Sequence, residues 1–136
     1  MKRIVLLAGL LSLVTGASLF FSDVRLKEYS LERQGNDIVL RWEAEVEVDV
    51  DLYVVQRSTT ASRGLFVDVR KISAQGAGRP YEFHDDQLYK DNSEMVSYRI
   101  VAVFKDGASY VFADKSIDYT STAVRRTWGS IKAMFQ

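Results

Sequence analysis

The feature that most constrains this chain is a nearly continuous alternation of apolar and polar residues between residues 22 and 119. A period of two places successive side chains on opposite faces, as in a β-strand with one buried face. Turn residues interrupt the alternation at short intervals, and no helical period appears before residue 120. The alternating segments are 24–31, 38–42, 52–57, 66–72, 81–85, 95–104 and 109–118. Seven short strands of this kind predict an all-β, antiparallel sandwich.

Two turns and the composition support a single domain of this class. Gly35-Asn36-Asp37 separates the first two predicted strands, and Lys105-Asp106-Gly107 separates the last two. Asp-Gly is favoured in such a hairpin because it tolerates a positive φ. A length of 136 residues with 47% apolar residues is enough for one buried core. The chain contains no cysteine, which excludes disulfides, thiolate metal sites and cysteine nucleophiles.

The N-terminal residues are interpreted separately from this domain. The basic pair Lys2-Arg3 precedes an apolar stretch from Ile4 to Val14, and Thr15-Gly16-Ala17 supplies the small residues that a signal peptidase reads. The sequence therefore predicts a signal peptide at residues 1–17 and a mature chain that is secreted or extracytoplasmic, in the periplasm or at the cell surface. The alternative is an uncleaved anchor extending through Phe21, which would make the chain a membrane-anchored accessory subunit.

Four blocks within residues 22–119 resemble a known family. They are Trp42, Tyr53–Ser58 (YVVQRS), Tyr81–Asp85 (YEFHD) and Tyr98–Gly107 (YRIVAVFKDG). In this order they are similar to a fibronectin type III domain of the bacterial secreted and cell-surface kind. The resemblance implies a seven-stranded antiparallel Ig-like sandwich, with Trp42 and Tyr98 packed between the sheets, and it implies nothing about chemistry. The Arg-Gly-Asp triplet by which some members bind integrins is absent at Lys105–Gly107, so that binding mode does not transfer.

The most conspicuous polar pattern is an acidic run between the second and third predicted strands. Its carboxylates alternate with apolar residues and belong to Glu43, Glu45, Glu47, Asp49 and Asp51. On a straight strand they share one face at spacings of about 6.5–7 Å, which is too wide to focus them on one calcium ion. The run is therefore predicted to be a solvated face, and no metal or other cofactor is expected. A calcium- or carbohydrate-binding module is the alternative if the strand bends.

Motifs typical of catalysis are missing from the sequence. His84 is the only histidine, and on a strand its neighbour Asp85 points to the opposite face, so no Ser-His-Asp arrangement is indicated. The chain has no Gly-x-Ser-x-Gly elbow, no phosphate-binding glycine loop and no paired histidines. We therefore predict that the chain is not an enzyme and that His84 is a surface residue on an edge strand.

The last segment, residues 120–136, has a different pattern. Val124, Trp128, Ile131 and Phe135 follow the spacing of one helix face, which predicts a short amphipathic C-terminal helix. Three surfaces are open to this stripe: the chain's own sandwich, a protein partner, or an anionic membrane surface. The residues predicted to contact a partner are Arg125, Arg126, Trp128, Ile131, Lys132 and Phe135.

These patterns together predict three parts: a signal peptide at 1–17, a fibronectin type III-like sandwich at 22–119, and a basic amphipathic tail at 120–136. The expected function is that of an exported, non-catalytic binding or structural module of the cell envelope or surface, with an adhesive role. Its sandwich loops or tail would contact a protein partner there. Eighteen basic and eighteen acidic residues balance one another, so no nucleic-acid partner is expected.

Overall fold

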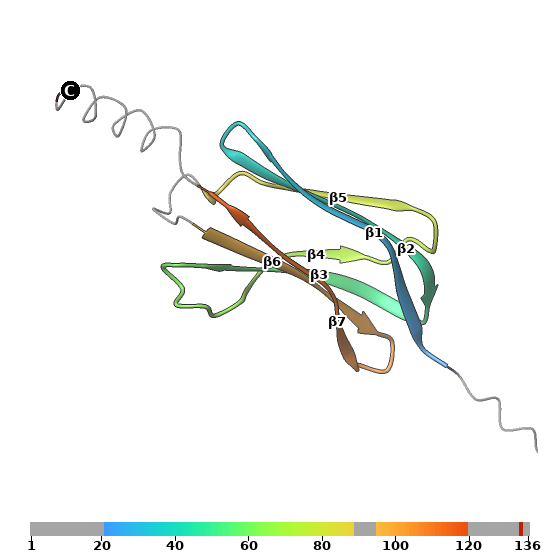
Figure 1. The fold of residues 1–136 in the computed structure, drawn as a ribbon. Coiled ribbons are helices and arrows are strands. Elements are labelled where there is room, and N and C mark those ends of the chain that lie inside the picture. The colour runs from blue at the N-terminus through green and yellow to red at the C-terminus, as the bar shows by residue number, and fades with distance from the viewer. Residues whose placement is uncertain (1–20, 89–94, 120–133, 135–136) are drawn as a thin grey trace, which may run out of the picture.

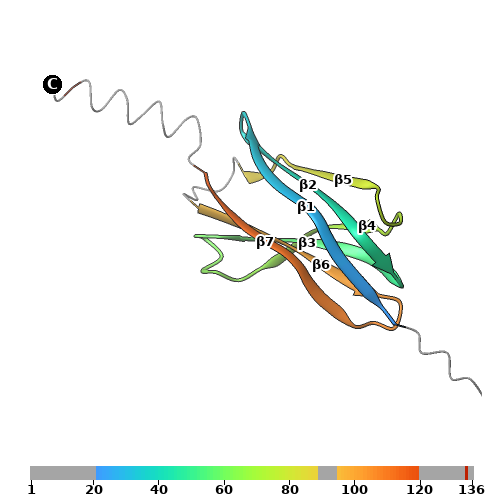
Figure 2. The same ribbon diagram turned by 45° about the vertical axis from the view of Figure 1, so that its right-hand side comes forward.

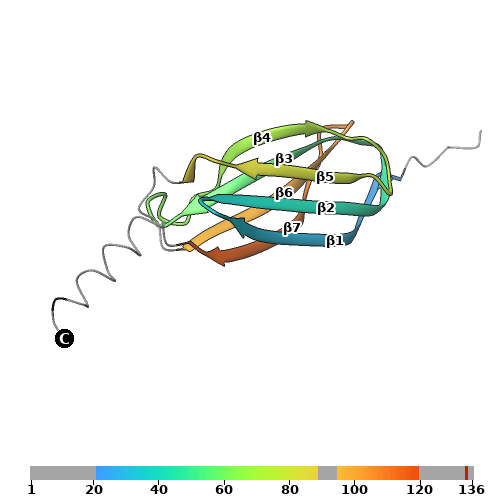
Figure 3. The same cartoon turned by 90° about the horizontal axis from the view of Figure 1, so that it is seen from above.

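A computed structural model of the chain describes residues 21–88, 95–119 and 134. The described residues form two stacked antiparallel sheets, shown from the side in Figure 1 and from above in Figure 3. One sheet has three strands in the order β1-β2-β5, and the other has four in the order β4-β3-β6-β7. The strands are β1 (Asp23–Gln34), β2 (Asp37–Val48), β3 (Val50–Thr59), β4 (Val67–Ser73), β5 (Pro80–Asp85), β6 (Met95–Phe104) and β7 (Ser109–Asp118).

The predicted fold class needs a correction. Its all-β, antiparallel part is confirmed, but no α-helical element lies within residues 21–88 or 95–119. The segment predicted to be a C-terminal helix, 120–136, lies outside the described residues apart from Met134. A stripe of about thirteen residues interrupted by Gly129 is marginal for a helix, so periodicity alone was weak evidence for one. Among the described residues, no helix is long and apolar enough to cross a membrane.

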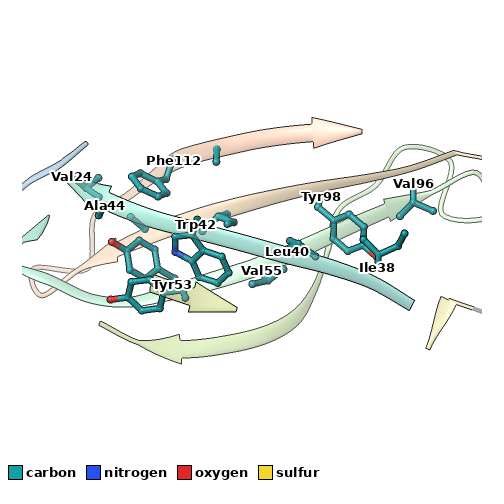
Figure 4. Packing of buried hydrophobic residues seen from close by; sticks show 14 of the residues in the cluster. Val24, Ile38, Leu40, Trp42, Ala44, Tyr53, Val55, Val96, Tyr98 and Phe112 are labelled. Atoms are coloured by element: carbon teal, nitrogen blue, oxygen red, sulfur yellow. The ribbon is translucent and has the colours of Figure 1, made fainter. Parts of the chain in front are cut away.

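The core lies between the two sheets and follows the period of two. Every second residue of β2 from Ile38 to Ala44 is at most 1% exposed, and the same holds on β6 from Val96 to Ala102. Trp42 stacks on Tyr81 with ring centroids 5.1 Å apart, and Figure 4 shows Trp42 beside Tyr53 within the packed cluster. Trp42 and Tyr98 are 1% and 0% exposed, so the prediction that both pack in the core is confirmed.

The predicted acidic face was wrong because β2 contains a bulge. Arg25 pairs with Val46 and Leu26 pairs with Ala44, so Glu45 is an extra residue on β2. A bulge shifts the phase of the alternation, so residues beyond it change face. Glu43 stays on the outer face beside Lys27, whereas Glu47 turns towards the core tyrosines.

Glu47 then links four segments of the chain. Its Oε2 accepts hydrogen bonds from the phenols of Tyr53 and Tyr81, each at 2.9 Å, and its Oε1 accepts one from the backbone N–H of Gly76 at 2.8 Å. Hydrogen bonds to an ionised carboxylate are stronger than neutral ones. This network ties β2, β3 and β5 together at one end of the sandwich, and it accounts for one of the five acidic residues by a structural role.

The two long sides of the sandwich differ. On one side β1 and β7 lie next to each other, as Figure 2 shows, and side chains join them. Lys115 Nζ donates to the carbonyl oxygen of Tyr29 at 3.1 Å, and Tyr119 Oη donates to that of Asn36 at 2.9 Å. On the other side β4 and β5 are the outer strands, and among the described residues nothing pairs with their free edges. The two sheets are therefore joined by side-chain hydrogen bonds on one side, whereas the edges of β4 and β5 are unpaired on the other.

Candidate functional site

A hollow of about 400 Å³ lies on the open side, where β4 and β5 border the space between the sheets. Residues paired across two strands share a face. Arg70 pairs with the buried Val55, and Asp85 pairs with the buried Ile38, so both side chains face inward. We call this hollow the open-edge pocket; it is lined by Arg57, Val69, Arg70, Phe83, His84, Asp85, Asp86 and Gln87.

The floor of the open-edge pocket is a buried ion pair. Asp85 is 2% exposed, and its Oδ2 accepts hydrogen bonds from Arg57 Nη1 at 2.6 Å and from Tyr98 Oη at 2.7 Å. The backbone N–H of Gln87 donates to Asp85 Oδ1 at 3.2 Å. Burial and the nearby charge of Asp85 raise the pKa of Tyr98, so its phenol stays a donor. A buried carboxylate with its lone pairs satisfied in this way holds the Arg57 guanidinium in a fixed position.

The two rims of the pocket carry different charges. On the β4 rim Arg70 is exposed, and it has no ion pair or hydrogen bond within the part of the chain that the structure describes. On the β5 rim His84 pairs with Glu82, which also accepts from Arg41 Nε at 2.6 Å. The hydrogen bond from His84, followed by that from Arg41, holds the pKa of Glu82 below its usual range. The unpaired cation of the pocket is therefore Arg70.

This arrangement suits a small anionic group. A guanidinium binds a carboxylate through two parallel N–H···O bonds, and Arg70 has its donors available for such a pair. Phe83 and Val69 add apolar surface, and the volume lies within the range of about 300–1,000 Å³ common for ligand sites. No group of three or more metal-ligating side chains occurs among residues 21–88 and 95–119.

Only some of the candidate residues selected from the sequence lie in the part of the chain that the structure describes. The six tail residues from Arg125 to Phe135 predicted to contact a partner lie outside the described residues. His84 lies on the outer strand β5 with its side chain 49% exposed, as predicted for a surface residue on an edge strand. Asp85 faces the opposite way and is buried, which confirms the prediction that it cannot orient His84.

Sequence reasoning missed the charged residues of the open-edge pocket. Asp85 follows Tyr81 and Phe83 at a spacing of two, and Arg57 follows Tyr53 and Val55 in the same way. Each charge therefore continues an inward-facing apolar row, which is a signal for a buried polar pair. The pairing of the two was not visible from the sequence, because it depends on β5 and β3 facing each other across the sandwich.

Known proteins give matches in structure only. No model of a protein family matches the chain, and no curated protein matches its sequence. Pectate lyase Pel3 from Pectobacterium carotovorum is similar in two crystal structures, with TM-scores of 0.52 and 0.50 and identities of 18% and 19%. These matches cover 74% and 70% of this chain but 28% and 27% of those chains. Pectate lyase PelI from Erwinia chrysanthemi, in complex with tetragalacturonic acid, reaches a TM-score of 0.47 at 18% identity, covering 70% of this chain and 27% of that one.

These matches correct several expectations. The chain spans about a quarter of the length of the Pel3 structures, and at such low identity the likeness concerns the fold alone. The fold neighbours named above are pectate lyases, not fibronectin type III domains, which overturns the fibronectin type III part of the predicted fold class. They also overturn the expectation of a non-catalytic module for protein–protein contacts and the prediction that the chain is not an enzyme. Missing motifs were weak grounds for both, because one fold hosts many functions.

Proposed function

We propose that this β-sandwich binds an acidic polysaccharide of the pectate class at the open-edge pocket. The observation that carries the proposal is the unpaired guanidinium of Arg70 at the rim of a pocket whose floor holds a second guanidinium, that of Arg57. Pectate is a polymer of galacturonate, so each sugar ring presents one carboxylate and several hydroxyls. The shared fold with pectate lyase Pel3 supports this class of ligand.

The pocket divides the recognition of one uronate between its two rims. Arg70 on β4 binds the carboxylate, because its donors have no other acceptor among the described residues. On the β5 rim, Asp86 hydrogen-bonds to the sugar hydroxyls, and its charge keeps the carboxylate on the Arg70 side. Asp85 takes no direct part, since its oxygens already accept from Arg57, Tyr98 and the Gln87 backbone.

The proposed ligand is compatible with the predicted export of the chain. A signal peptide at residues 1–17 would take the domain out of the cytoplasm and to the compartments that contain structural polysaccharides. Export remains a prediction from the sequence. A protein partner for the tail is likewise a prediction, and it does not compete with a sugar at the open-edge pocket.

Calorimetric titration of the full chain with trigalacturonate tests the proposal. Arg70→Gln is expected to weaken binding about tenfold, because a hydrogen bond to a charged group contributes about 1.5–3 kcal/mol. Lys71→Gln is the matched control: Lys71 is the next residue of β4, pairs with Val54 and faces away from the pocket. Raising the ionic strength is expected to weaken binding further, since the rim is exposed.

Two results would refute the proposal. One is the absence of heat with the wild type at millimolar trigalacturonate. The other is an equal loss of affinity in Arg70→Gln and Lys71→Gln, which would show that binding depends only on the overall charge of the domain. Weaker binding in Arg70→Gln alone, with an unchanged midpoint of urea unfolding, supports a direct role for this guanidinium.

A further inference from the structure

A second hollow, of about 430 Å³, lies at the other end of the sandwich, where β1 begins and β6 ends. We call it the end pocket; it is lined by Ser22, Asp23, Val24, Arg25, Phe104 and Tyr110. Tyr110 pairs with the buried Ala102 and so lies on the inward face of β7, yet it is 56% exposed. An aromatic ring on a core-facing position is therefore left open to solvent at this hollow.

Two other residues that line the end pocket form a loose donor and acceptor pair. Arg25 Nε lies 3.5 Å from Asp23 Oδ2, and their side chains are 63% and 49% exposed. Such an exposed pair contributes little to stability, so its groups are available to a ligand. Asp23 offers acceptors and Arg25 offers donors, while their opposite charges offset one another.

We propose that the end pocket is a second sugar subsite, which binds a pyranose ring by stacking on Tyr110 rather than by charge. One face of a pyranose ring is rich in C–H groups and suits the negative face of an aromatic ring, while its hydroxyls match the paired acceptor and donor of Asp23 and Arg25. The identity of the sugar rests on the proposed function. Because the local charges cancel, this subsite accepts a galacturonate whose carboxyl is methyl-esterified, which the open-edge pocket does not.

The two subsites are too far apart to be one site. Tyr98 at the floor of the open-edge pocket and Phe104 at the end pocket are six residues apart on β6, or about 20 Å at the rise of a β-strand. The end pocket also opens at the β1 and β7 side, opposite the free edges of β4 and β5. The domain therefore holds two separate stretches of polysaccharide.

The test uses a neutral probe, fully methyl-esterified trigalacturonate, titrated into the full chain and followed by calorimetry. The wild type is expected to bind it with one site per chain, and free trigalacturonate with two. Tyr110→Ala is expected to weaken binding of the neutral probe about tenfold, and Arg70→Gln to leave it unchanged. Val111→Ala is the matched control, since Val111 is the adjacent exposed residue of β7 and pairs with Val101 rather than with Ala102.

The outcomes separate this inference from the proposed function. Two results would overturn the end pocket as a subsite. One is that the wild type does not bind the neutral probe. The other is that Tyr110→Ala binds it with an affinity within twofold of that of the wild type. If instead the Tyr110 effect is found but Arg70→Gln leaves binding of free trigalacturonate intact, the open-edge pocket fails and the end pocket stands. Asp23→Ala tests the acceptor separately: it is expected to weaken binding of the neutral probe a few-fold, and unchanged binding would exclude the hydroxyl contact.

Discussion

Replacing Asp85 by Asn removes the charge at the floor of the open-edge pocket while keeping the shape of the side chain. Asp85 is 2% exposed, and its partner Arg57 has a side chain 16% exposed. Removing one partner of a buried ion pair costs about 3–5 kcal/mol, because the remaining charge stays buried without the opposite charge that neutralised it. Arg57 retains some contact with water, so we expect Asp85→Asn to lose about 3 kcal/mol of unfolding free energy.

Urea unfolding of the full chain, followed by tryptophan fluorescence, measures this loss. With a slope of about 1.5 kcal/mol per M, the midpoint of unfolding should fall by about 2 M. Asp86→Asn, at the neighbouring exposed carboxylate, should change the free energy by no more than about 0.5 kcal/mol. The double variant Arg57→Met, Asp85→Leu should recover much of the loss, since it leaves no unpaired charge. A loss below about 1 kcal/mol for Asp85→Asn, or one equal to that of Asp86→Asn, would refute the buried-pair reasoning.

Three further predictions concern the rest of the domain. Burial, aided by the Glu47 carboxylate, raises the pKa of Tyr81 to about 12. The stability that the protonated phenol adds is therefore present below pH 10 and is lost as pH rises towards 12. Glu47→Gln should lower the pKa of Tyr81 in an absorbance titration, and an unchanged pKa would contradict the link to Glu47. Arg63 has φ of 53°, so Arg63→Gly should stabilise the chain by about 0.5 kcal/mol in urea unfolding, and destabilisation would contradict this. His84→Gln should raise the depressed pKa of Glu82 towards its usual value in a carboxyl carbon NMR titration. The wild type loses stability as pH falls through the pKa of Glu82, and this loss should be smaller in the variant. Identical titrations of the two proteins would contradict the pairing of His84 with Glu82.

The strands were predictable from the sequence because their signals are local. The predicted segments 95–104 and 109–118 coincide with β6 and β7, and Gly107 has the positive φ expected of the hairpin turn between them. Apolar alternation identified the core in the same way, since each inward residue of β2 and β6 is read from its own strand. These features need no knowledge of which strands become neighbours.

The candidate site was not predictable, because it depends on relations between strands. The extra residue Glu45 turns the side chain of Glu47 to the opposite face of the sheet, and the alternation of residues in β2 does not indicate that bulge. Likewise, Arg70 matters only because β4 is an outer strand whose inward face borders β5 across the gap. The inward charge also has a structural effect, since charged side chains on outer strands discourage pairing with other chains.

The most direct test of the central claim is a map of the bound sugar on the domain. Amide chemical shifts of the ¹⁵N-labelled chain are recorded during titration with trigalacturonate in high salt and in low salt. We expect salt-sensitive shifts at the open-edge pocket, centred on Arg70, His84 and Asp86, and none on the outer face at Lys71. Shifts that are absent at β4 and β5, or that appear equally at Arg70 and Lys71, would contradict binding of an acidic polysaccharide at this pocket.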